Sequence, residues 1–156
     1  MGQTNFTGPI TSGDLQQGQT NGPNTGFARL AQSVALTQNG ATAVSATIYI
    51  PAGSQITSFD IDVLTAFNSG TSATLSIGTS AAATTYVGSV DVKTATGRIA
   101  PTYTAAQLAA MSNQTVLGVA APTVAPVVVT VTPVGTAATA GYVNVIINYI
   151  QLTSSN

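Results

Sequence analysis

The chain has 156 residues, no cysteine and no histidine, and only 4% of its residues are charged, for a formal net charge of −1. Three cations are too few for the basic patch that nucleic-acid binding normally needs, and thiolate or imidazole chemistry is excluded because those residues are missing. A surface of neutral polar side chains causes little self-repulsion and tolerates close packing against copies of the chain or a partner.

Residues 1–26 form a separate compositional zone that is rich in Gly, Asn, Gln, Thr and Pro. The sizeable apolar residues of this zone are Phe6, Ile10 and Leu15. Alone, the segment buries too little apolar surface to offset the entropy of ordering it. Two interpretations remain open: a disordered tail, or an extended N-terminal arm that becomes ordered on a neighbouring subunit, with Phe6, Ile10 and Leu15 as its anchors.

From residue 27 onward, short runs of β-branched residues alternate with turn residues, and the Asn39-Gly40 pair is a strong turn signal. Period-two alternation predicts strands over residues 27–36, 42–50, 55–64, 72–78, 84–92, 113–119, 126–134 and 141–152. One helix is expected over 103–111, with Thr104 as its N-cap and with Leu108 and Met111 on one side. Residues 27–156 are therefore predicted to form an antiparallel β-sandwich of the jelly-roll type, with one short helix.

The segment 57–64, TSFDIDVL, contains Asp60 and Asp62, half of the chain's four acids. Alternation places both carboxylates on the strand face opposite the apolar side chains, which are Phe59, Ile61 and Val63. The carboxylates are thus expected to point to solvent, and a metal site or an interface ion pair are the alternatives. Acid–base catalysis usually needs one desolvated carboxyl group, of which there is no sign. We expect no enzymatic activity, no cofactor and no metal.

The last expected strand is apolar on both faces. One face carries Val143, Val145, Ile147 and Tyr149. On the other face, Ile146 and Ile150 interrupt Asn144 and Asn148. Such a strand is either central with a covered outer side or part of a subunit interface. Burial under the arm or a loop, and an intersubunit contact through Ile146 and Ile150, both remain open. Elsewhere, Lys93 and Arg98 flank TATG, which is expected to be a turn.

Several segments, in this order, resemble small structural proteins of tailed bacteriophages. The segments are TSGDLQQGQTNGPNTGFARLAQSVALTQN, ATIYIPAGSQIT, TAFNSGTSATLSIGT, VDVKTATGRI and VVVTVTPVGTAATAGYVNVIINYIQL. The chain looks like a capsid decoration, or cement, protein of the jelly-roll type. The resemblance covers nearly the whole chain and includes no catalytic motif. It implies a virion structural protein on the capsid exterior that bridges subunits of the major capsid protein, as a homotrimer or, less favoured, a homodimer.

The main alternative is a head-fibre or tail receptor-binding module that binds glycans. Such a site would use exposed aromatic side chains, for which Tyr86, Tyr103 and Tyr142 are the candidates, with packing at strand ends as the competing explanation. A bacterial surface-layer or pilus module is a third possibility, weakened by the absence of a secretion signal in the first residues. No apolar run reaches the roughly 18 residues of a membrane helix, so a membrane is not an expected partner. A nucleic acid is not expected either, because the chain has only three cations.

Overall fold

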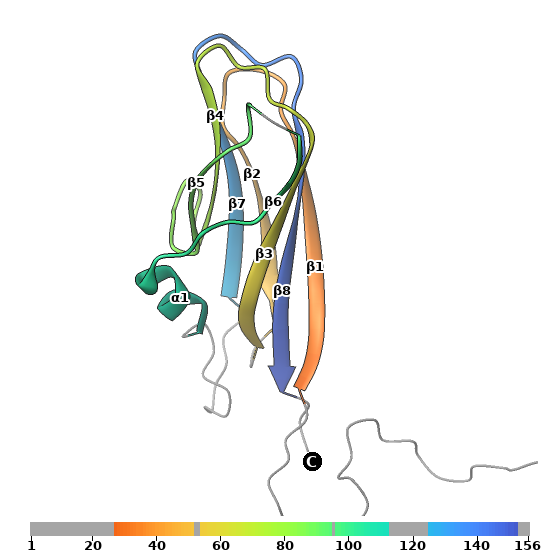
Figure 1. Cartoon of the computed structure of the whole chain (residues 1–156), viewed down its shortest axis with the longest axis vertical. Coiled ribbons are helices and arrows are strands. Elements are labelled where there is room, and N and C mark those ends of the chain that lie inside the picture. Colours follow the sequence, from red (N-terminus) through yellow and green to blue (C-terminus); the bar gives the residue numbers. More distant parts are fainter. Residues whose placement is uncertain (1–26, 52–53, 95, 113–124, 153–156) are drawn as a thin grey trace, which may run out of the picture.

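The structure is a computed structural model that describes residues 27–51, 54–94, 96–112 and 125–152. Within these ranges the chain forms eight strands and one helix (Figure 1). The elements are β1 Phe27–Thr37, β2 Val44–Ile50, β3 Ser54–Thr65, β4 Ser72–Gly78, β5 Val87–Asp91, β6 Gly97–Ile99, α1 Ala105–Ser112, β7 Ala125–Val134 and β8 Tyr142–Leu152. The arm with Phe6, Ile10 and Leu15, and the strand expected over 113–119, lie outside the described residues.

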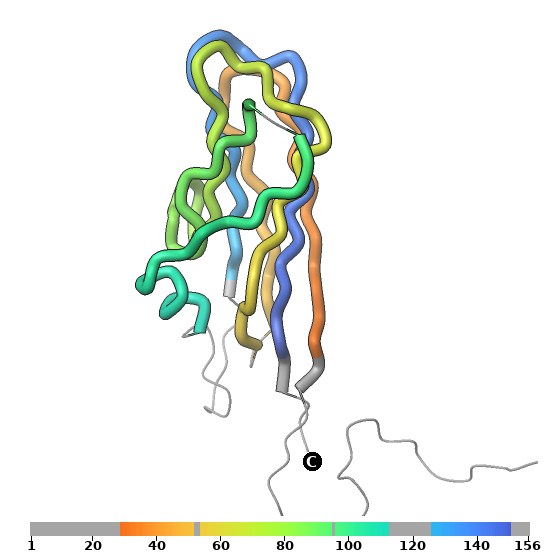
Figure 2. The backbone as a smooth tube through the Cα atoms, viewed as in Figure 1, coloured from red at the N-terminus to blue at the C-terminus, as the bar shows by residue number. Residues whose placement is uncertain are grey.

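The strands form two four-stranded antiparallel sheets. We call the sheet with order β1-β8-β3-β6 the first sheet and the sheet with order β2-β7-β4-β5 the second sheet. Strands pair from the ends of the chain inward: β1 with β8, β2 with β7, β3 with β6, and β4 with β5. This nested pairing results when one long hairpin folds over itself, which is the path of a jelly roll (Figure 2). The predicted all-β sandwich with one short helix is confirmed.

The core lies between the two sheets and follows the alternation of the strands. In the first sheet the buried faces include Phe59, Ile61 and Val63 of β3 and Val143, Val145 and Ile147 of β8. In the second sheet they include Leu75 and Ile77 of β4 and Val127, Val129 and Val131 of β7. The face assignments predicted for β3 and β8 are therefore confirmed. Burial of so many branched side chains is the main term that stabilises the fold, at roughly 1.5–3 kcal/mol for each.

Two strands differ from the sequence prediction by more than the one or two residues at an end seen in the other described strands. β5 begins at Val87, three residues later than expected, because the preceding loop crosses the outer face of the second sheet, where the Ala82 N–H donates to Thr130 Oγ1 at 3.1 Å. β6 replaces part of the turn expected between Lys93 and Arg98, and it is only three residues long. A strand this short carries too little alternation to be recognised in the sequence.

Helix α1 is capped as predicted. The Thr104 hydroxyl accepts a bond from the Gln107 N–H at 3.2 Å, and the Gln107 side chain accepts one from the Thr104 N–H at 2.8 Å. This reciprocal arrangement is a capping box. Met111 is buried, but Leu108 is 50% exposed, because Gln107 and Met111 rather than Leu108 lie toward the sandwich.

The two ends of the sandwich differ. At one end, which we call the loop end, the loops 38–43, 66–71 and 135–141 are tied together by backbone and side-chain hydrogen bonds. At the other, which we call the terminal end, Phe27 of β1 lies opposite Leu152 of β8. Helix α1 also lies toward the terminal end (Figure 1). Both ends of the described chain therefore leave the sandwich at the same place.

Several contacts hold the loop end together. Asn68 accepts bonds from the backbone N–H groups of Thr139 and Ala140 at 2.8 and 3.0 Å. The buried Gln38 side chain donates to the carbonyl of Thr42 at 2.8 Å. Gly141 packs so close to Phe67 that a Cβ atom at this position would overlap the ring. The loop end is thus a closed, well-braced cap rather than an open cleft.

Candidate interaction surface

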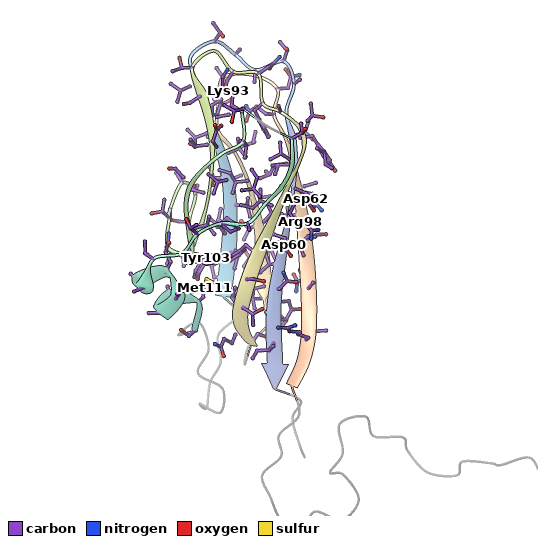
Figure 3. All side chains as sticks on the ribbon, viewed as in Figure 1. Asp60, Asp62, Lys93, Arg98, Tyr103 and Met111 are labelled. Atoms are coloured by element: carbon purple, nitrogen blue, oxygen red, sulfur yellow. The ribbon has the colours of Figure 1, made fainter. Side chains whose placement is uncertain are left out.

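The outer face of the first sheet carries most of the charged side chains in the described part of the chain. These are Arg29 on β1, Asp60 and Asp62 on β3, and Arg98 on β6. Figure 3 shows Asp60, Asp62 and Arg98 together over β3 and β6. The outer face of the second sheet is instead made mainly of uncharged Ser, Thr and Val side chains. The outer face of the first sheet is therefore the surface on which charged side chains can contribute to the recognition of a partner.

Asp62 and Arg98 form an ion pair across neighbouring strands. They are directly opposite each other in the β3–β6 register, and Arg98 Nε lies 3.1 Å from Asp62 Oδ1. The hydrogen bond from Arg98 to the Asp62 carboxylate raises the pKa of Arg98. The Arg98 side chain is 63% exposed, so solvent screens the pair, which limits its contribution to stability. The turn cation expected at Arg98 is thus a strand residue with a specific partner.

Asp60 has a different partner, Asn148 of β8. The Asn148 amide donates to Asp60 Oδ2 at 2.9 Å and to Ser58 Oγ at 3.1 Å. A register shift between Ile56 and Ser58 places Thr57 so that its hydroxyl donates to the Asn148 carbonyl at 3.1 Å. The two carboxylates of the D-x-D segment therefore do not converge on one point. In the residues that the structure describes, no group of three or more potential metal ligands occurs.

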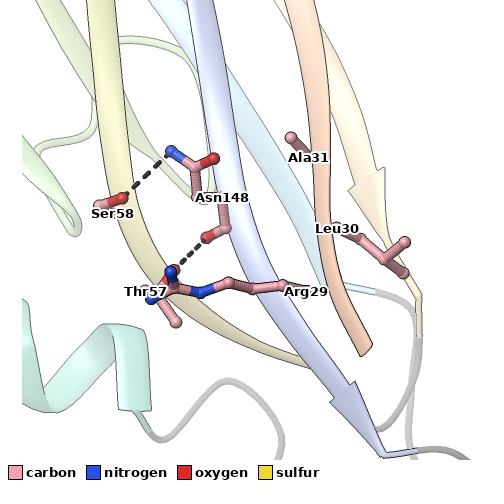
Figure 4. A pocket seen from close by; sticks show the side chains of 6 residues that line it. All are labelled: Arg29, Leu30, Ala31, Thr57, Ser58 and Asn148. Carbon is pink, nitrogen blue, oxygen red and sulfur yellow. Dashed lines mark hydrogen bonds between the residues drawn. The ribbon is translucent and has the colours of Figure 1, made fainter. Parts of the chain in front are cut away.

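A shallow, open pocket lies at the lower part of this face. Figure 4 shows its lining, which consists of Arg29, Leu30, Ala31, Thr57, Ser58 and Asn148. The hydroxyl and amide groups of Thr57, Ser58 and Asn148 are already bonded to β3 and β8. Arg29 makes no ion pair within the described residues. The pocket therefore offers one uncompensated cation and no arrangement of acid, base and nucleophile.

Ile146 and Ile150 lie on this same outer face, as the sequence predicted. β8 is a central strand, between β1 and β3. Ile146 is flanked by Ser33 and Asp60, and Ile150 by Arg29 and Gln55. Both isoleucines are half-buried by these neighbours. The structure thus places each isoleucine beside a charged residue, Ile146 next to Asp60 and Ile150 next to Arg29, and their role in an interface stays a prediction.

The three tyrosines considered for a glycan site do not gather on the surface. Tyr86 is fully buried, and its ring stacks on Phe59 with centroids 6.1 Å apart. The Tyr103 hydroxyl accepts a bond from the Phe59 N–H at 3.0 Å. Tyr142 begins β8 and is half-buried. Two of the three tyrosine side chains therefore contact one core residue, Phe59. This is a packing role, which was the alternative to sugar binding.

Lys93 lies at the loop end (Figure 3), and Asp91 lies beside it in the chain and makes local contacts. The Lys93 ammonium group donates to the carbonyl of Ser69. Asp91 accepts bonds from the Lys93 N–H at 2.8 Å and from the Thr94 hydroxyl at 2.7 Å, and these bonds lower the pKa of Asp91. Both charges therefore brace a turn.

The sequence placed Asn148 on the same face as Ile146 and Ile150, but it did not reveal the contact of Asn148 with Asp60 or the position of Arg29 on this face. Asn148 meets β3 through pairing between strands that are far apart in the chain, as in its contact with Asp60, 88 residues away, and Arg29 reaches this face because β1 pairs with the other side of β8. The alternation of a single strand gives the face of a side chain but not its neighbour on another strand. Only the strand order makes the grouping visible.

Comparison with protein-family models, with curated proteins and with solved structures finds no match to this chain. Among the described residues, no helix has both the length and the apolar character needed to cross a membrane.

Proposed function

We propose that this protein is a virion structural protein of a tailed bacteriophage, a decoration or cement protein on the outer surface of the capsid. It stabilises the lattice by bridging subunits of the major capsid protein. The resemblance of the sequence to such proteins motivates the proposal. The jelly roll agrees with it, because viral capsid proteins use this fold, although lectins use it as well.

The observation that carries the proposal is the place where β1 begins. Phe27, to which residues 1–26 are joined in the chain, lies at the terminal end, opposite the closed loop end. A segment of this length can reach up to about 85 Å when extended, which is far enough to contact neighbouring subunits of a lattice. We infer that the terminal end faces the capsid and that Phe6, Ile10 and Leu15 bind there. The loop end then faces outward.

The nearly neutral surface supports close association. The chain has three basic and four acidic residues, and the charges of the described part are largely paired or locally bonded. Packing such a body densely on a lattice costs little electrostatic repulsion. Its contacts are then expected to depend on apolar burial and neutral hydrogen bonds rather than on salt bridges.

Co-sedimentation with expanded, decoration-free capsids of the parent phage tests the proposal. The wild-type chain should bind saturably, with a fixed copy number per capsomer. A chain with Phe6→Ser, Ile10→Ser and Leu15→Ser, and a chain that lacks residues 1–26, should both keep the circular dichroism of the folded domain. Both should bind at least tenfold more weakly.

The matched control is a chain with Gln3→Ser, Gln16→Ser and Gln19→Ser, which changes the same segment without removing apolar side chains. It should bind like the wild type. Full retention of binding by the deletion would reject the arm. Absence of binding by the wild-type chain would reject the capsid role, and binding on a glycan array would then favour a receptor-binding module.

A further inference from the structure

The four edge strands of the sandwich differ in how well they are protected. A free edge presents unpaired N–H and C=O groups, and proteins normally blunt it with charges, bulges or short strands. On one side of the sandwich, β6 has three residues and carries Arg98. On the same side, β5 has five residues, a register shift against β4 and Asp91 at its end. Both of these edges follow the protective rules.

The opposite side of the sandwich is not protected in this way. β1 is eleven residues long and pairs with β8 without any register shift. It contains no proline, and its only charge is Arg29, near its beginning. Its neighbour in the second sheet, β2, has seven residues and no charge. In Figure 1 no described element lies beside the free edge of β1. The contrast between the two sides indicates that the free edge of β1 is covered by another strand in the working protein.

The sequence of β1 is complementary to itself in an antiparallel pairing centred on Ser33. On the outer face, Ala31 then lies opposite Ala35 and Ser33 opposite Ser33. Arg29 lies opposite Thr37 of the other copy, so no two cations meet. On the inner face, Leu30, which is 40% exposed, lies opposite Leu36. Gln32 lies opposite Val34 in this register, while the pairs described above match small residues with small ones and leucine with leucine. No like charges meet, so the pairing carries no electrostatic penalty.

We propose that β1 pairs with β1 of a second copy of this chain, about a twofold axis at Ser33, so that the two first sheets form one continuous eight-stranded sheet. A twofold interface uses the same patch on both subunits, and added main-chain hydrogen bonds supply its affinity. The contact produces a dimer or another even-numbered assembly, which agrees with the homodimer and not with the homotrimer among the two states that the sequence resemblance implies. It does not depend on capsid binding.

A single introduced cysteine tests the pairing, because the chain has none of its own. Ser33 is exposed, so the full-length Ser33→Cys chain should fold. Residues opposite each other on antiparallel strands have Cα atoms about 4.5–5.5 Å apart, which is within the range of a disulfide. Mild oxidation should convert most of the Ser33→Cys protein to a covalent dimer. The control is the Ser89→Cys chain, whose substitution is at an exposed site on the protected β5 edge. This chain should not form a covalent dimer.

The register gives a second test. Ala31→Cys and Ala35→Cys chains should each fail to crosslink alone, since equivalent atoms would then be about 14 Å apart along the strands. A co-refolded mixture of the two should form the mixed disulfide. A monomeric wild-type chain, or equal crosslinking of the Ser33→Cys and Ser89→Cys chains, would overturn the proposal. The β1 edge would then belong to residues 1–26 or to another protein.

The molar mass of the protein in solution, measured by light scattering, tests the β1 pairing independently of the capsid hypothesis. The wild-type chain should be dimeric, and Ser33→Lys should dissociate at least tenfold more readily, because two cations would meet at the axis. Ser89→Lys should remain dimeric. A trimer without the Ser33 crosslink would overturn β1 pairing and leave capsid binding intact. A crosslinked dimer that does not bind capsids would overturn only the capsid role.

Discussion

Tyr86 is a single buried side chain whose ionisation makes the stability of the core depend on pH. Its ring stacks on Phe59 and is fully buried between the sheets. Burial raises the pKa of Tyr86 to about 12, because the phenolate would lose its hydration. Desolvation by burial also raises the pKa of Tyr103, whose hydroxyl accepts the bond from the Phe59 N–H. The region around Phe59 therefore resists ionisation.

The raised pKa of Tyr86 predicts a loss of stability in alkaline solution. Below pH 10 the side chain is neutral in both the folded and the unfolded chain. Between pH 10 and about 12 only the unfolded chain ionises freely, so the free energy of unfolding falls, by up to about 3 kcal/mol at the top of this range. In urea titrations from pH 8 to 11.5, Tyr86→Phe should lose less stability than the wild type.

The pH dependence, rather than the absolute stability, is the quantity to compare, since removing the hydroxyl also changes the packing. Tyr49→Phe, at a side chain that is 63% exposed, is the control for the chemistry of the substitution. Tyr103 still ionises in the variant, so a smaller slope should persist. Identical slopes for the Tyr86→Phe variant and the wild type would show that Tyr86 is not the group responsible.

At the scale of elements, the capping box of α1 makes a measurable prediction. Thr104→Ala removes the hydroxyl that accepts the Gln107 N–H bond, and loss of such a cap typically costs about 1 kcal/mol. Urea denaturation should show this decrease in the free energy of unfolding. Thr104→Ser keeps the acceptor and should restore most of the lost stability. Equal stability of the alanine and serine variants would contradict the proposed cap.

The strands show what can and cannot be predicted from local sequence. The alternation in β3 and β8 correctly identified the core faces, because one face of each is uniformly apolar. β6 was missed, since three residues carry almost no periodic signal and it forms only by pairing with β3. The spacing of Leu108 and Met111 did not determine which of the two is buried. That outcome depends on where α1 docks, which is a property of the tertiary structure.

The candidate interaction surface was only partly predictable for the same reason. Ile146 and Ile150 were singled out because they interrupt an otherwise polar face of β8. The partners of Asp60 and Asp62 were not foreseen, since Asn148 and Arg98 reach them through the strand order. The unprotected edge of β1 likewise cannot be recognised until the positions of β5 and β6 are known.

At the scale of the whole molecule, the scarcity of charge predicts a stability that hardly depends on salt. Within the described residues there is one ion pair, and it is exposed. Raising NaCl from 0.05 to 1 M should change the free energy of unfolding by less than about 1 kcal/mol. Asp62→Asn, which breaks the pair, should have an effect of similar size. A larger salt effect on the wild type would indicate electrostatic contacts involving the rest of the chain.

The nested strand order also has a consequence for the synthesis of the protein. β8 occupies an interior position of the first sheet, bonded to β1 on one side and to β3 on the other, yet it is the last of the described strands to be translated. Until the ribosome has released it, β1 and β3 each lack their main neighbour and remain available for pairing with other chains. Such long-range pairing is slow and prone to aggregation. Nascent chains that meet before β8 has emerged are therefore at risk of pairing with each other through β1 or β3.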